Sequence, residues 1–127
     1  ELQLPGTVIH IGDFAFAGCT SLTAMAVPAG VTVLERYAFY GCTKLASLAL
    51  PDGLLTIEEA ALSYCSALSA VRLPAGLTRI GPGAFRGCNS LTALELPPSL
   101  VHIADRAFDG CVGLGAELGI PDTLPYI

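Results

Sequence analysis

The stretch AFAGCTSLTAMAVP, residues 15–28, decides the fold because the same order of residue types returns along the whole chain. Every interval between successive cysteines is 23 residues, at Cys19, Cys42, Cys65, Cys88 and Cys111. The same step relates five prolines, at Pro5, Pro28, Pro51, Pro74 and Pro97. Written once, the unit is LxxLxLPxxVxxIxxxAFxGCxx. A fixed period of this length indicates a repeat solenoid.

Each unit contains two short segments that predict extended backbone. Met25 and Val27 alternate with Ala24 and Ala26, which is the period-2 pattern of a strand with one buried face. Pro28 has no N–H for a neighbouring strand, so the strand is expected to end there. A second apolar pair follows on the next side of the unit. It recurs as Val31 and Leu34, Leu54 and Ile57, Leu77 and Ile80, and Leu100 and Ile103.

The Ala-Phe and Gly-Cys dipeptides predict the third side of the unit. Phenylalanine recurs at Phe16, Phe39, Phe85 and Phe108, with Leu62 as the one substitute, and we expect this column to form a spine on the outer side of the solenoid. Glycine precedes four of the cysteines, which predicts a tight turn with a backbone angle that other residues resist. Tyr64 takes the glycine position in one unit.

Composition and charge exclude several classes of partner. The 127 residues are 53% hydrophobic and 13% charged, with a formal net charge of −5. This balance argues against a nucleic-acid surface. Glycine and proline interrupt every apolar run before it reaches the length of a membrane helix, so no direct membrane insertion is expected. One repeat buries too little to offset its conformational entropy, and stacking is therefore required for stability.

The LxxLxLP portion followed by AFxGC resembles the BspA-like leucine-rich repeats, also called the Treponema-type class. The resemblance covers essentially the whole chain. It implies an arc-shaped solenoid with short parallel strands on the concave face and mostly turns elsewhere. It also implies protein binding or adhesion, and a location at the cell surface or outside the cell.

The expected domain organisation is a single leucine-rich-repeat solenoid over residues 1–127, with about five and a half repeats of 23 residues. Both ends fall inside a repeat and neither supplies a polar cap. The sequence-based expectation is therefore a piece of a longer array, whose ends further repeats or another chain would cover.

The cysteines are interpreted as a buried structural column. Free cysteine packs as a small hydrophobic residue, whereas a zinc site needs four converging ligands. A disulfide between neighbouring units is geometrically conceivable, but five thiols cannot all pair within the chain. We therefore predict neither a metal nor any other cofactor.

Other polar groups are also interpreted structurally. Glu35, Glu58 and Glu59 suggest calcium, but Arg36 in the same region favours an ion-pair ladder. Ser99 precedes His102 by three residues without an evident oxyanion hole. No catalytic residue is predicted, and the protein is not expected to be an enzyme.

The concave strand face is the predicted surface for a partner, because solenoids commonly bind there. The candidate contact residues are its outward columns: Ala24, Ser47, Ala70 and Ala93, and Ala26, Ala49, Arg72 and Glu95. Small side chains allow a protein to approach closely, but they also suit any curved face with little room. Both interpretations stay open at this point.

The functional hypothesis is a non-enzymatic module for protein–protein recognition or adhesion. The alternative is a structural connector of a larger assembly, bound through the ends of the solenoid. Family resemblance favours the cell surface, whereas unpaired thiols are compatible with a reducing interior.

Overall fold

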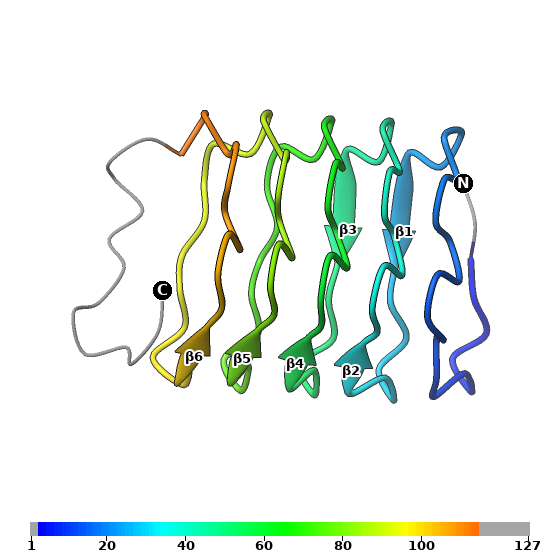
Figure 1. Ribbon diagram of the computed structural model, residues 1–127. Coiled ribbons are helices and arrows are strands. Elements are labelled where there is room, and N and C mark those ends of the chain that lie inside the picture. The colour runs from blue at the N-terminus through cyan, green and yellow to red at the C-terminus, as the bar shows by residue number, and fades with distance from the viewer. Residues whose placement is uncertain (1–2, 115–127) are drawn as a thin grey trace.

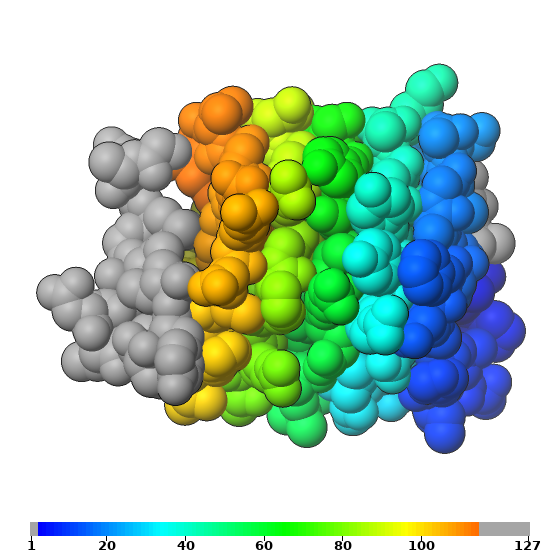
Figure 2. Space-filling view, in the orientation of Figure 1, coloured from blue at the N-terminus to red at the C-terminus, as the bar shows by residue number. Residues whose placement is uncertain are grey.

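The computed structural model describes residues 3–114, which form a stack of coils with one 23-residue repeat in each coil. The first and last described coils lie at opposite ends of the stack (Figure 1). Equivalent residues of successive coils lie side by side, so that each repeat position forms a column. The coils appear as adjacent bands in the space-filling view (Figure 2). The predicted solenoid with short parallel strands is confirmed, and no helix occurs in the part of the chain that the structure describes.

The first side of each coil carries the predicted concave strands. Strands β1 (Ala24–Ala26) and β3 (Ser47–Ala49) pair in parallel, with Met25 opposite Leu48. These two central side chains are buried, because alternate residues of a strand point to opposite faces. Beyond β3 the pairing continues only as single bridges, at Ala70 and Ala93. A regular strand in every coil was expected, and residues 3–114 show it on this side in two.

The second side of each coil carries a longer sheet. Its strands are β2 (Val33–Leu34), β4 (Thr56–Ile57), β5 (Arg79–Ile80) and β6 (His102–Ile103), paired in parallel in that order. The last residue of each strand is buried, and these apolar residues stack on one another along the axis. The predicted second extended segment is confirmed.

The third side, which we call the convex segment, consists of tight turns that also bond to the next coil. Alternate N–H groups donate to the following coil at 2.7 to 3.0 Å in the first step: Phe14 to Arg36, Phe16 to Ala38 and Gly18 to Tyr40. The N–H groups between them close turns within the coil, at 3.1 Å: Ala15 to Gly12, Ala17 to Phe14 and Cys19 to Phe16. The later coils repeat the pattern. The backbone N–H groups of the convex segment therefore have hydrogen-bond partners, although the segment does not form a regular strand.

Two columns of the convex segment adopt a left-handed backbone. Gly18, Gly41, Gly87 and Gly110 have φ between 72° and 77°, and Tyr64 follows them at 62°. The predicted turn angle before each cysteine is confirmed, and Tyr64 adopts it as well. The second column was not predicted. It holds Phe14, Tyr37, Ala60, Gly83 and Arg106, with φ between 54° and 63°.

The core lies between the three sides and is continuous along the stack. Phe39 and Phe85 are fully buried, and the rings of Phe16 and Phe39 stack at 5.3 Å. The phenylalanine column thus belongs to the convex segment, as predicted, but its rings point into the core rather than forming an external spine. Leu62 is buried at the same position in its own coil and separates the two stacked pairs of rings.

The cysteine column is structural, as predicted. All five cysteines are free thiols, and all except Cys19 are buried. Each buried thiol donates a hydrogen bond to a main-chain carbonyl of the preceding coil, at 3.0 to 3.2 Å. For example, the Cys65 S–H lies 3.2 Å from the carbonyl oxygen of Phe39. The column therefore links neighbouring coils as well as filling the core.

Candidate functional site

The structure places the predicted contact residues in two columns of the concave face. Ala24 and Ser47 lie opposite each other in β1 and β3, and the same column continues through Ala70 and Ala93. In the second column, Ala26 lies opposite Ala49, and Arg72 and Glu95 occupy the equivalent positions in the next two coils. All eight are exposed except Ala24, which is half-buried.

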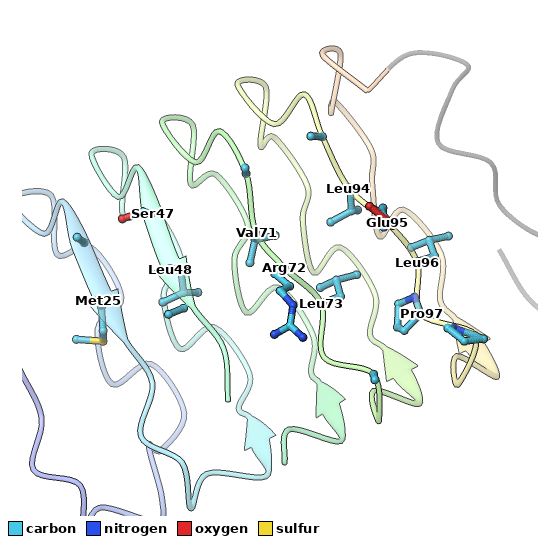
Figure 3. A pocket seen from close by; sticks show the side chains of 16 residues that line it. Met25, Ser47, Leu48, Val71, Arg72, Leu73, Leu94, Glu95, Leu96 and Pro97 are labelled. Atoms are coloured by element: carbon cyan, nitrogen blue, oxygen red, sulfur yellow. The ribbon is translucent and has the colours of Figure 1, made fainter. Parts of the chain in front are cut away.

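A hollow of about 890 Å³ covers this face. Seven of the eight predicted residues line it, and Ala26 is the exception. Its floor is formed by the apolar residues between the two columns, including Met25, Leu48, Val71 and Leu94. Figure 3 shows these side chains on successive coils, with Arg72 and Glu95 among them. The hollow is open, wide and mostly apolar.

Charged groups occupy one part of this hollow. Arg72 Nη1 lies 3.5 Å from Asp52 Oδ1, a partner that the sequence did not predict. The side chains of Arg72 and Asp52 are 79% and 91% exposed, so their ion pair contributes only ~0–1 kcal/mol to stability and can rearrange. Arg72 and Glu95 thus offer both signs of charge beside an apolar floor.

Two of the three acidic residues considered as a calcium site, Glu35 and Glu59, lie beside basic side chains instead. Glu59 Oε1 lies 3.8 Å from Arg36 Nε, which confirms this part of the predicted ion-pair ladder. Glu35 Oε2 lies 3.8 Å from His10 Nδ1, a pairing that the sequence did not predict. Among residues 3–114, no group of three or more His, Cys, Asp or Glu side chains is arranged to hold a metal ion.

The Ser99 hydroxyl has a structural role. It donates a hydrogen bond to the carbonyl oxygen of Leu77 in the preceding coil, at 2.6 Å. This bond joins neighbouring coils and uses the proton that a nucleophile would need to give to a base. The expectation that the protein is not an enzyme stays a prediction.

An aromatic cluster on the convex segment was missed at the sequence level. It consists of Phe14, Tyr37, Tyr40 and Tyr64, whose rings contact one another across three coils. A signal was present, because Phe14 and Tyr37 are 23 residues apart and therefore stack.

The part of the chain that the structure describes contains no helix that could cross a membrane.

Comparison with known proteins identifies the family. A model of the BspA type leucine rich repeat region matches residues 1–115 as six copies. No curated protein matches the chain in sequence.

Solved structures show the same fold. A leucine rich repeat protein of T. pallidum is 36% identical with a TM-score of 0.87, over 89% of this chain and 55% of that one. A leucine rich cell surface protein from Faecalibacterium prausnitzii is 28% identical with a TM-score of 0.86, over 90% of this chain and 30% of that one. A leucine-rich repeat protein from Bacteroides ovatus is 27% identical with a TM-score of 0.69, over 87% and 40%.

The chain therefore spans about half of the T. pallidum protein and less than a third of the F. prausnitzii protein. The repeat spacing, the stacked coils and the match of the family model over nearly the whole chain lead to one conclusion: the chain belongs to the BspA type leucine rich repeat family.

Proposed function

We propose that this chain is a protein-recognition module that binds its partner in the concave hollow. The observation that carries the proposal is the hollow of about 890 Å³, which contains seven of the eight residues that the sequence marked as outward-facing. Apolar floor residues supply contact area, and the alanines above them leave room for a partner's side chains.

Charge gives this surface its expected specificity. Arg72 and Glu95 occupy the same column on neighbouring coils, so a partner with an acidic and a basic group at matching separation would pair with both. Mispaired charges would disfavour other proteins. We expect the bound segment to cross several coils, because the lining residues come from four of them.

We also propose that the module acts at the cell surface, in adhesion or in recognition of another surface protein. The support is family membership and the likeness to a leucine rich cell surface protein. Free thiols do not oppose this location, because four of the five are buried and shielded from oxidants.

Site-specific photo-crosslinking tests the binding surface. A photoreactive side chain at Ala49 or Ala70 should crosslink to a defined protein in the native cells or their surroundings. The same group at Val101, an exposed residue outside the hollow, is the matched control and should not give that product. If only the photoreactive group at Val101 gave a crosslinked product, the proposal that the partner binds in the concave hollow would be wrong. Labelling of intact cells with a membrane-impermeant reagent tests the proposed location.

A further inference from the structure

The aromatic cluster of the convex segment is an exposed surface outside the concave hollow. The rings of Phe14 and Tyr37 stack in parallel at 4.7 Å, and Tyr40 contacts both Tyr37 and Tyr64 at 5.2 and 5.7 Å. Phe14, Tyr40 and Tyr64 are 52%, 37% and 41% exposed. These three rings therefore leave aromatic surface exposed to solvent.

Arginines accompany these aromatic rings. The guanidinium carbons of Arg36 and Arg86 lie 5.9 and 6.0 Å from the ring centres of Tyr37 and Tyr64. A shallow hollow of about 300 Å³ joins the tyrosines to Arg106 in a later coil. Tyrosine and arginine are the residue types that dominate the buried centres of protein–protein interfaces. The convex segment therefore carries the tyrosine and arginine side chains that are typical of an interface centre, in addition to the small-residue surface of the concave hollow.

Three columns of this surface carry complementary groups in the second and the fifth described coils. In one column, Arg36 is followed three coils later by Asp105. In the next column, Tyr37 is followed three coils later by Arg106. In a third column, Ala17 precedes Tyr40, which is followed three coils later by Asp109. In each column these two groups are complementary, whereas the first coil, which supplies Asp13, Phe14 and Ala17, lies outside these pairs.

A two-fold axis between the coils of Ala60 and Gly83 would place these complementary ends together. Such an axis runs across the convex face and reverses the order of the coils in a second copy, so that each column faces itself in the opposite direction. Arg36 would then face Asp105 of the second copy, and Tyr37 would face its Arg106.

Two further pairs of positions fit this arrangement. Tyr40 could donate its phenolic hydrogen to Asp109 of the second copy. At the centre, Ala60 would face Gly83, so the two backbones could approach closely where the side chains are smallest. The geometry points to a second copy of this chain as the occupant of the convex face, in an antiparallel dimer with two-fold symmetry.

The ion pairs within one copy do not oppose this rearrangement. Arg36 and Glu59 are 3.8 Å apart, and Arg86 and Asp109 are 3.5 Å apart, with about half of each side chain exposed. Exposed pairs of this kind contribute little to stability, so these side chains can reorient toward a second copy. In the dimer, both concave hollows would stay open, because they lie on the other side of the stack.

Charge reversal tests the pairing of Arg36 with Asp105. Sedimentation equilibrium of the full chain over a concentration series should show a species of twice 13.1 kDa. R36D places two aspartates opposite each other at both ends of the dimer, and D105R does the same with two arginines. Each variant alone should associate about ten-fold more weakly than the parent. An equimolar mixture of the two should restore association to within about three-fold, because both contacts are then of opposite charge.

The matched control is R72E, which reverses a charge in the concave hollow and should leave self-association unchanged. Circular dichroism of each variant verifies that it is folded. A parent chain that stays monomeric at every concentration overturns the proposal. So does a dimer that survives R36D and D105R, or a mixture that fails to recover. A dimer lost only in R72E would assign self-association to the concave face and would also overturn it.

Discussion

At the scale of single residues, the cysteines show what a repeat pattern can and cannot predict. Equal spacing and apolar surroundings were enough to predict a structural column of cysteines, four of which are buried, but not their redox state. The hydrogen bond from each buried S–H to a carbonyl of the preceding coil was not predictable. It depends on how far one coil is displaced along the axis from the next, and sequence periodicity contains no information about that displacement.

The buried thiols predict a loss of stability at alkaline pH. The hydrogen bond with Cys42 and burial raise the pKa of Cys65 far above the usual range, and Cys111 and burial do the same for Cys88. Unfolded thiols have a pKa of about 8.5 and release their protons above it, while the folded state keeps them. The contribution of Cys65 and Cys88 to the free energy of unfolding should therefore be constant below this value and fall above it, whereas the hydrogen bonds that lower the pKa of Cys42 and Cys111 act in the opposite direction. The expected slope is about 1.4 kcal/mol per pH unit for each thiol.

Urea unfolding measured between pH 7 and pH 10 would test this slope. The matched control is the double variant C65A/C88A, which should be less stable at every pH because of its cavities but should lose most of the slope. An equally steep decline in the double variant would show that other groups cause the alkaline sensitivity.

At the scale of the elements, the extended segments could be predicted from the sequence, whereas the convex segment could be predicted only in part. Alternating apolar residues and a terminating proline predicted β1 and β3, since those patterns reflect local geometry. The left-handed column that contains Phe14 and Tyr37 gave no such signal. Aromatic residues rarely adopt a positive φ, and here the bonds to the next coil impose it.

A glycine comparison tests the convex segment. Gly18 and Gly87 share a φ of 74°, but a Cβ added at Gly87 would lie 2.6 Å from Cδ1 of Tyr64, whereas at Gly18 it would meet nothing within 4 Å. G18A should cost about 1 kcal/mol through backbone strain alone. G87A should cost roughly 1–3 kcal/mol more, because the Tyr64 ring must move. Thermal or urea unfolding of both variants measures the difference, and equal losses would contradict the close packing of Tyr64 on Gly87.

At the scale of the whole molecule, the period alone predicted the architecture, because each coil packs chiefly on its neighbours. The concave columns followed from the same reasoning, since outward positions in a strand are determined by alternation. The hollow itself was not predictable. Its volume depends on the curvature of the stack and on the depth of the apolar floor.

The modular stack predicts that the chain tolerates the removal of one whole repeat. Deletion of residues 47–69 removes 23 residues and joins Ala46 to Ala70, which restores every column. The shortened chain should fold, with a smaller dependence of the unfolding free energy on urea because less surface is buried. Deletion of residues 47–58 is the control. It breaks the register between the coils before the junction and the coils after it, and it should abolish a single cooperative unfolding transition, as followed by circular dichroism.

The alternating bonds of the convex segment have a mechanical consequence. They run along the axis of the stack, and each coil is joined to the next by its own small set. A force that pulls the two ends apart would act on each set of hydrogen bonds separately. The coils would therefore unfold one at a time rather than all at once. Each unfolded coil would release roughly 75 Å of chain. Under a pulling force, this protein would lengthen in steps, and the unfolding of each coil would absorb a small amount of energy.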